Sequence, residues 1–119
     1  MLLPGVESLD LSEPLARFAE QGYARLGLAL SEDGREALRA RADDLMLGRV
    51  SYPGLFFQLD APNGRYGDLR YGAGYQGPSL HYRKLEKLEL DPLLFSWIEN
   101  PLFARIARTL IPGDITLYR

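Results

Sequence analysis

A stretch rich in glycine, proline and tyrosine, residues 52–78, most limits what this chain can fold into. It holds six of the twelve glycines, three of the eight prolines and four of the seven tyrosines. Glycine and proline interrupt helices and strands, and Pro53-Gly54 and Asn63-Gly64 are typical turn pairs. We therefore predict a long loop over 52–78. Its aromatic content favours an ordered binding loop or a lid over a solvated linker.

The segment before this loop begins with a helical pattern. Ser12 is expected to cap a helix that carries Glu13 and Pro14 in its first turn, where an acid and a proline are both tolerated. Gly22 is expected to end it. The apolar residues at helical spacing are Leu11, Leu15, Phe18 and Ala19. The residues that come next, 23–28, alternate in polarity and predict a short, half-buried strand.

A second helix is predicted between Ser31, its expected cap, and Gly48, which closes it. Its apolar stripe consists of Leu38, Ala42, Leu45 and Met46. The residues expected to face water are Arg35, Arg39, Arg41 and Asp43. The neighbouring acidic pair Asp43-Asp44 therefore reads as part of a solvated face and not as a catalytic pair.

Two further helices are predicted after the loop, and both begin with the same device. Asp91 is expected to cap one helix with Pro92 as its first residue, and Asn100 and Pro101 repeat the arrangement. The expected apolar stripes are Leu94, Phe95 and Ile98 in the first helix and Leu102, Phe103, Ile106, Ala107 and Leu110 in the second. The last apolar run, 115–118, predicts a strand. The chain is therefore expected to be mostly helical with a few short strands.

The composition excludes several classes of function. The chain has 14 basic and 16 acidic residues, a net charge of −2, which does not suggest a nucleic-acid partner. It has no cysteine, which excludes disulfide scaffolds and thiolate chemistry and favours a reducing, cytoplasmic compartment. It lacks a signal-peptide pattern and any apolar run near the ~20 residues of a membrane helix, so we predict a soluble protein without a membrane partner.

The sequence offers little catalytic machinery. His81 is the single histidine, whereas a non-haem iron site needs two histidines and a carboxylate. A loop-edge histidine with a structural role is therefore the expected reading of His81. The glycines of 72–77 lack the preceding strand, the following helix and the lysine of a phosphate-binding loop. We predict no catalytic residue and no metal ligand set within these 119 residues.

Lys84 has two interpretations. It alternates with Leu85 and Leu88 after the tyrosine-rich loop, and a lysine that projects into a cavity can bind a carboxylate through charge-assisted hydrogen bonds. It also lies in a charged segment with Glu86 and Lys87, where an exposed lysine is the simpler interpretation. Residue chemistry alone favours the exposed lysine.

The order of the segments, from about Leu15 onward, resembles the phytanoyl-CoA dioxygenase family of iron(II)/2-oxoglutarate oxygenases. The resembling phrases, in chain order, are 18–23, the Leu30-Ser31 helix start, 82–88, 91–95, the helix 100–110 and the turn 113–115. Each phrase is loose, and their common order carries the resemblance. In that family a His-x-Asp pair and a distal histidine, which hold the iron, come after these segments.

The resemblance implies an α+β fold, in which 1–119 is a single partial domain: the N-terminal helical part of a double-stranded β-helix (jelly-roll, cupin-like) oxygenase. It implies iron(II) and 2-oxoglutarate as cofactors of the complete protein and a small-molecule substrate that is hydroxylated. Neither cofactor is expected to bind stoichiometrically to this chain, which should be inactive alone. Lys84 falls where the family has a lysine that contacts 2-oxoglutarate, and Gln58, Tyr75 and Gln76 become candidate substrate contacts.

Two other interpretations remain open. The chain could be a small, non-catalytic interaction domain whose tyrosine-rich loop binds a peptide or another subunit, since tyrosines in a glycine-rich setting make adaptable contact surfaces. It could also belong to a pseudoenzyme that has lost its catalytic half. If it is a partial domain, its unpaired apolar faces are the expected sites of self-association.

Overall fold

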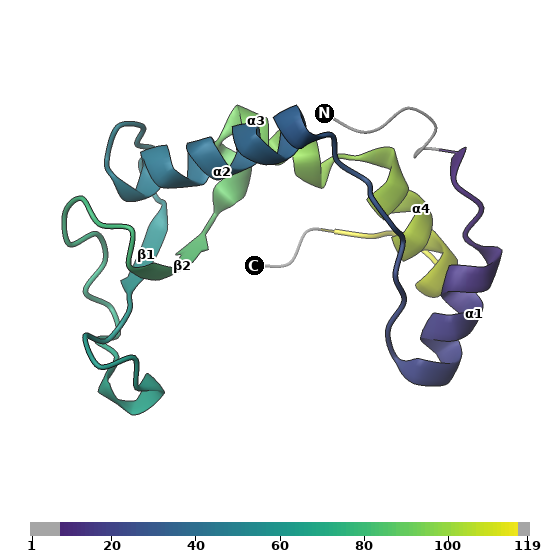
Figure 1. Ribbon diagram of the computed structural model, residues 1–119, viewed down its shortest axis with the longest axis horizontal. Helices are drawn as coiled ribbons and strands as arrows, with labels where there is room; N and C mark the ends of the chain where they lie inside the picture. The colour runs from purple at the N-terminus through teal and green to yellow at the C-terminus, as the bar shows by residue number, and fades with distance from the viewer. Residues whose placement is uncertain (1–7, 117–119) are drawn as a thin grey trace. The chain divides into compact units, whose positions relative to one another are not determined.

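The computed structural model describes residues 8–116, which contain four α-helices and a two-stranded antiparallel sheet (Figure 1). The helices are α1 (Ser12–Gln21), α2 (Glu32–Met46), α3 (Pro92–Ile98) and α4 (Pro101–Leu110), and the strands are β1 (Phe56–Leu59) and β2 (Tyr82–Glu86). The described chain divides into two compact units, one formed by 8–37 and 97–116 and the other by 38–96. Each unit has buried residues of its own.

Helix α1 in the first unit confirms the predicted helix but corrects its cap. Leu11 occupies the N-cap position, and the Asp10 carboxylate accepts hydrogen bonds from the Ser12 amide at 2.9 Å and the Ser12 hydroxyl at 2.7 Å. Ser12 is thus the first helical residue and not the cap. At the other end Gly22 has φ 79° and donates its N–H to the Phe18 carbonyl at 2.8 Å. This left-handed ending is the role predicted for Gly22.

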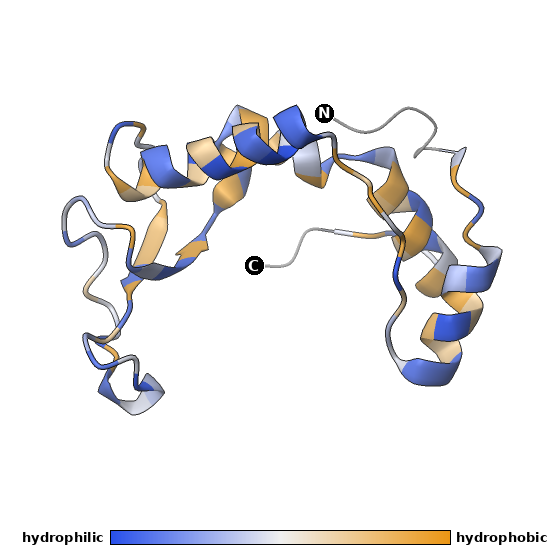
Figure 2. Cartoon of the chain, viewed as in Figure 1, coloured by the Kyte–Doolittle hydropathy of each residue, from blue (hydrophilic) through white to orange (hydrophobic). Residues whose placement is uncertain are grey.

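The core of the first unit lies between α1 and α4. Leu11 and Leu102 are buried, and Leu9, Leu15, Leu26, Ala29 and Ile106 pack against them. The apolar faces of both helices are orange in Figure 2. The Arg105 guanidinium donates to the Leu9 carbonyl at 2.7 Å, which ties the chain before α1 to α4. Leu102 and Ile106 belong to the apolar stripe that the sequence predicted for α4.

The strand predicted over 23–28 is absent: these residues form a loop, and Leu30 alone makes an isolated bridge. Leu26 packs against the core, but Leu28 is 84% exposed. Gly27 adopts φ 80°, a left-handed conformation that interrupts an extended run. The alternation was therefore wrong as a strand signal: only Ala24 and Leu26 of this segment are half-buried, and the turn at Gly27 breaks the extended run.

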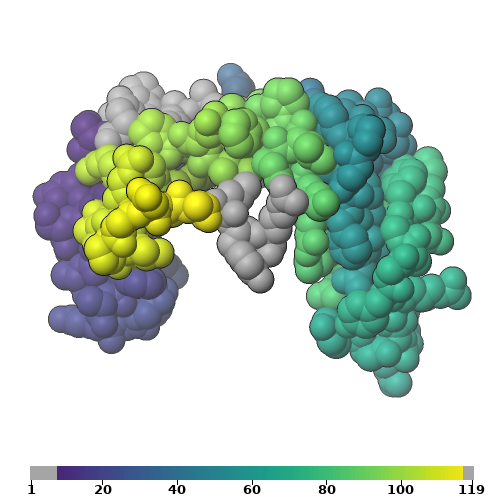
Figure 3. All heavy atoms as spheres, turned by 180° about the vertical axis from the view of Figure 1, so that it is seen from behind, coloured from purple at the N-terminus to yellow at the C-terminus, as the bar shows by residue number. Residues whose placement is uncertain are grey.

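The segment after α4 runs beside that helix, as Figure 3 shows in yellow. Ile115 and Thr116 are not in a strand, so this part of the predicted strand 115–118 is wrong, and Leu117 and Tyr118 lie outside the described residues. A hollow of about 500 Å³ lies between α4 and this segment. Phe103 and Ile115 line it, and both are partly exposed.

The second unit contains the sheet and the end of α2. Strands β1 and β2 pair antiparallel in the register Phe56↔Glu86, Phe57↔Leu85, Gln58↔Lys84 and Leu59↔Tyr82. The shift between Gln58 and Leu59 leaves Arg83 without a partner residue, which is a β-bulge. Strand β1 corrects the prediction of a loop over the whole of 52–78. Its four residues lie between turn signals, and its partner strand comes more than twenty residues later in the sequence, so local patterns do not reveal it.

The rest of the predicted loop packs onto the same unit. A 3-10 turn, Tyr66–Asp68, comes after β1, and two buried residues, Ala61 and Leu69, flank it. The Ser79 amide donates to the Met46 carbonyl at 3.3 Å, which attaches the end of the stretch to the end of α2. Most of 52–78 is thus irregular, as predicted, but it is tied down at several points.

The predicted start of α2 is confirmed, since the Ser31 hydroxyl accepts a hydrogen bond from the Gly34 amide at 3.1 Å. Leu45, from the predicted apolar stripe, is 1% exposed. Within residues 8–116, none of the helices combines the length and the apolar character that a membrane crossing requires.

Candidate functional site

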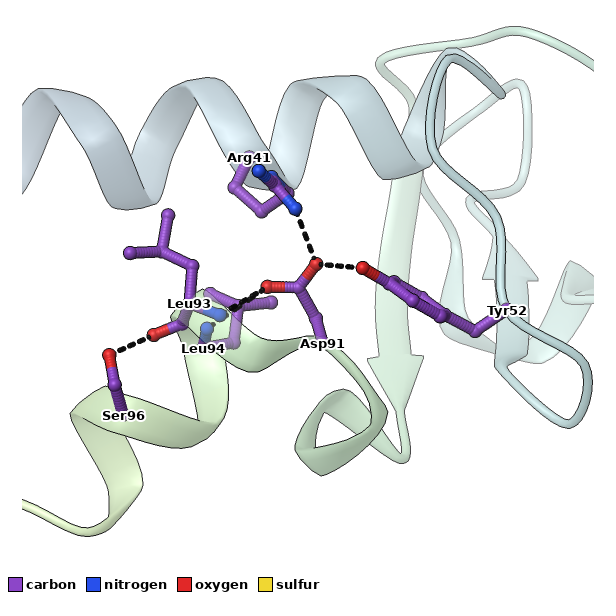
Figure 4. Close-up of polar contacts among 6 residues, drawn as sticks. All are labelled: Arg41, Tyr52, Asp91, Leu93, Leu94 and Ser96. Carbon is purple, nitrogen blue, oxygen red and sulfur yellow. Dashed lines mark hydrogen bonds and ion pairs between the residues drawn. The ribbon is translucent and has the colours of Figure 1, made fainter.

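A buried carboxylate at the start of α3 connects three parts of the second unit (Figure 4). Asp91 is 0% exposed, and its Oδ1 accepts from the amides of Leu93 at 2.9 Å and Leu94 at 3.1 Å. These bonds confirm the predicted helix cap. Its Oδ2 accepts from Arg41 Nη1 at 2.7 Å and from the Tyr52 hydroxyl at 2.9 Å. We call Arg41, Tyr52 and Asp91 the Asp91 node.

Arg41 corrects a prediction, because it was expected to face water with the other arginines of α2. Its side chain is only 30% exposed and pairs with the fully buried Asp91 side chain. A lone arginine in a polar stripe gives no local sign of this contact, since its partner lies 50 residues later in the sequence.

The electrostatics of the Asp91 node favour the ionised carboxylate. Burial alone raises the pKa of Asp91, but hydrogen bonds from the Leu94 amide, the Tyr52 hydroxyl and Arg41 outweigh it. The positive charge of Arg41 adds to this effect, and the pKa lies below its ordinary value. The hydrogen bond to Asp91 in turn raises the pKa of Tyr52, helped by burial. With two donors on each oxygen, the carboxylate is saturated and has no position left to act as a base.

The antiparallel pair of strands β1 and β2, which we call the hairpin, brings two of the predicted site residues together. Gln58 and Lys84 are cross-strand partners, and Gln58 is 4% exposed. The Gln58 Oε1 accepts from Arg83 Nη1 at 3.3 Å, across the bulge. The Lys84 side chain is 52% exposed and forms an ion pair with Glu86 at 2.5 Å. Its ammonium is thus accessible, and an added carboxylate would compete with Glu86 for it.

The other two predicted site residues, Tyr75 and Gln76, lie beside the opposite face of the hairpin. Side chains of consecutive strand residues point to opposite faces, so Phe57 lies opposite Gln58. The Tyr75 ring stacks on Tyr82 with 5.5 Å between centroids and meets the edge of Phe57 at 5.0 Å. The Gln76 amide donates to the Tyr82 hydroxyl at 2.6 Å. The predicted site is therefore split between two faces. Phe57, Tyr75 and Tyr82 form what we call the aromatic cluster.

A small hollow lies beside the aromatic cluster and was not predicted from the sequence. It measures about 250 Å³ and is lined by Leu45, Gly48, Val50, Ser51, Tyr52, Leu55, Phe57 and Tyr75. We call it the Tyr75 hollow. The one signal in the sequence was Tyr75 itself, a large aromatic residue between glycines. Burial raises the pKa of Tyr75, with a smaller contribution from Tyr82.

The tyrosine-rich stretch also exposes two rings to solvent. Tyr66 and Tyr71 are 67% and 65% exposed and meet edge to face at 6.4 Å. The Arg83 guanidinium lies over the Tyr66 ring at 5.1 Å from its centroid. The hydrogen bond between the two tyrosines raises the pKa of Tyr71. These rings and Arg83 form an exposed surface of the kind that the interaction-domain alternative requires.

The iron implied by the resemblance does not fit the residues present. His81 is exposed, its amide donates to the Ser79 hydroxyl at 3.1 Å, and its carbonyl accepts from the Asp60 amide at 2.8 Å. Residues 8–116 contain no group of three or more histidine, cysteine, aspartate or glutamate side chains placed to hold a metal ion. Comparisons of the chain with protein-family models, with curated proteins and with solved structures found no match.

Proposed function

We propose that this chain is part of an iron(II)/2-oxoglutarate-dependent oxygenase of the phytanoyl-CoA dioxygenase type, to which it supplies Lys84 as a contact for 2-oxoglutarate. The observation that carries the proposal is the position of Lys84. It lies in a strand, after an ordered loop and before two helices that each begin with a cap and a proline. These segments are part of the order on which the resemblance rests, whereas 23–28, a strand in that order, is a loop here. We place such a protein in the cytoplasm, as part of a jelly-roll fold.

Lys84 has the chemistry that the role requires. Its ammonium is about half exposed, and it can donate charge-assisted hydrogen bonds to a carboxylate. Glu86 now occupies that position and would have to turn away. Gln58, its cross-strand partner, lies on the same face, whereas Tyr75 and Gln76 lie by the aromatic cluster. In this proposal Gln58 supports the co-substrate side, and Tyr75 and Gln76 contact the substrate.

The metal must be held by residues outside this segment, because one histidine cannot make the two-histidine, one-carboxylate set of such sites. Held by such residues, iron(II) and 2-oxoglutarate would supply the chemistry for hydroxylating a C–H bond of a small molecule. The residues described here would bind the co-substrate carboxylate and form part of the wall that excludes water.

The test is to measure succinate formation from 2-oxoglutarate by a protein that includes the residues encoded after Arg119. We expect Lys84→Met to raise the KM for 2-oxoglutarate by roughly 10- to 100-fold, because a hydrogen bond to a charged group is lost. Lys87→Met is the matched control and should leave the KM unchanged. We also expect the 119-residue chain to bind no stoichiometric iron. A longer protein without 2-oxoglutarate turnover, or equal KM values in both variants, would contradict the proposal.

The exposed Tyr66 and Tyr71 rings favour one second candidate, a non-catalytic interaction domain. Large exposed rings backed by an arginine are typical of binding surfaces. The two candidates predict different coding sequences downstream of Arg119. A His-x-Asp segment there supports the oxygenase, whereas a stop codon and a folded, monodisperse 119-residue chain in light scattering support the interaction domain.

A further inference from the structure

We propose that the Tyr75 hollow is a binding site for a small apolar molecule or group, about the size of one aromatic ring. Its volume is about 250 Å³. An apolar protein cavity of about 150 Å³ is large enough to bind benzene. The walls are mainly hydrocarbon, with Leu45, Val50, Leu55, Phe57 and the ring of Tyr75 facing the space. The hollow therefore has the size and the lining for an apolar guest.

The hydroxyl groups of the two tyrosines at the hollow both donate hydrogen bonds to other parts of the unit. The Tyr52 hydroxyl donates to the Asp91 carboxylate at 2.9 Å. The Tyr75 hydroxyl donates to the Met46 carbonyl at 3.2 Å. These two rings therefore present mostly carbon to the hollow.

Three backbone amides around the hollow also donate within the unit: Gly48 to the Leu45 carbonyl at 3.2 Å, Val50 to that of Asp44 at 3.3 Å and Leu55 to that of Tyr52 at 3.4 Å. Ser51 is the one lining residue with an aliphatic hydroxyl, and it is exposed. The hollow is open to solvent, since the Tyr75 residue is 41% exposed, and an apolar occupant would gain by covering the carbon surface of its walls.

The wall made by Tyr75 is held in place from two sides. Gly48 has φ 72°, and a Cβ at this position would lie 2.6 Å from the Tyr75 hydroxyl oxygen. Any larger residue would thus push the ring away. On its other side the ring stacks on Tyr82 with an interplanar angle of 12°. The hollow is therefore a preformed feature and not a gap left by a mobile side chain.

This inference goes beyond the proposed function, since it needs neither iron nor 2-oxoglutarate. Its test is a titration of the ¹⁵N-labelled chain with toluene, followed by amide spectra and thermal unfolding. We expect chemical-shift changes at Gly48, Val50, Leu55 and Tyr75, and a melting temperature that rises with toluene concentration. Phenol, which has the same number of heavy atoms, should bind more weakly because its hydroxyl loses contacts with water where it meets the apolar walls.

Matched variants locate the site. Leu55→Phe places a ring in the hollow and should abolish the toluene-induced changes. Leu80→Phe makes the same substitution at a residue of the same unit that is 56% exposed, and it should bind toluene like the parent. Val50→Phe is a second filling variant, in case Leu55→Phe fails to fold by circular dichroism. Undiminished toluene binding in the folded filling variants, shifts confined to other regions, or phenol binding as tight as toluene would each overturn the proposal.

Discussion

The caps of α3 and α4 share a sequence device but differ in the contacts that they make. Asp91-Pro92 starts α3 in the second unit, and Asn100-Pro101 starts α4 in the first. Both caps are buried, at 0% and 3% exposure, and each accepts a hydrogen bond at 2.9 Å from the amide two residues ahead. At the level of the local backbone the two positions are similar, although Asp91 also accepts from the Leu94 amide at 3.1 Å.

They differ in the second polar atom of each side chain. The second oxygen of Asp91 accepts from Tyr52 and Arg41, which lie 39 and 50 residues away in the sequence. The amide nitrogen of Asn100 is buried and has no hydrogen-bond partner among the residues that the structure describes. A charged cap can therefore join distant segments, whereas a neutral cap of the same shape serves only its own helix. The comparison predicts very different sensitivities to substitution.

The largest effect is expected from Asp91→Ala. The change removes the cap and leaves Arg41 and Tyr52 without their common acceptor. Breaking a buried ion pair costs about 3–5 kcal/mol, and the partial exposure of Arg41 places the expected loss near the lower end. Asn100→Ala should cost about 1 kcal/mol, the usual value for a lost cap. Urea denaturation followed by circular dichroism measures both, and equal losses would show that the Asp91 node adds nothing to capping.

The next largest effect is expected at low pH, which should weaken the Asp91 node. Because the pKa of Asp91 lies below its ordinary value of 3.8, the ionised carboxylate stabilises the fold above about pH 4. This contribution is lost as the pH falls through the lowered pKa. We expect the difference in unfolding free energy between the parent and Asp91→Asn to be constant from about pH 8 to 5 and to shrink below about pH 4. Other carboxylates cancel in the difference, and a pH-independent difference would contradict the assignment.

The difference between local and long-range contacts also explains how much of the fold could be predicted from the sequence. The caps of α1, α3 and α4, the left-handed end of α1 and the start of α2 depend on residues within a few positions of each other, and sequence patterns identified all but one of these devices correctly. The exception was the cap of α1, displaced by one residue. Strand β1 and the partner of Arg41 depend on contacts between residues more than twenty positions apart. No local pattern specifies which distant segment supplies the other half of such a contact.

In the candidate site, too, the sequence predicted individual residues but not the contacts that depend on tertiary packing. The sequence identified Gln58, Lys84, Tyr75 and Gln76 as residues of interest, and the structure places all four on or beside the hairpin. The sequence did not show that these residues lie on two different faces of the hairpin. The bulge at Arg83 and the pairing register determine the face on which each residue lies. Nor did the sequence identify the Tyr75 hollow, since the position of Gly48 against Tyr75 depends on tertiary packing.

Tyr52→Phe should have an intermediate effect. It removes a single hydrogen bond to the ionised Asp91 and keeps the ring in the Tyr75 hollow, so we expect a loss of about 1.5 kcal/mol. The raised pKa of Tyr52 means that its contribution is complete below pH 10 and is lost as the pH rises through its folded value. Urea denaturation at pH 7 and in the alkaline range measures both. Tyr23→Phe, at a residue 62% exposed, is the control, and a similar loss in both variants would contradict the assigned role.

The smallest effect is expected when serine replaces the neutral cap. Serine caps helices about as well as asparagine, and Asn100→Ser also removes the buried amide nitrogen that has no described partner. The relief of that group should offset the space left behind, so the free energy of unfolding should stay within about 0.5 kcal/mol of the parent. Asp91→Ser makes a similar exchange at the other cap but loses the contacts to Arg41 and Tyr52, and we expect a loss several times larger. Because serine keeps the capping oxygen at both positions, the difference between these two variants measures the long-range part of the Asp91 node alone. If Asn100→Ser proved as damaging as Asp91→Ser, the two caps would be energetically alike despite their different partners.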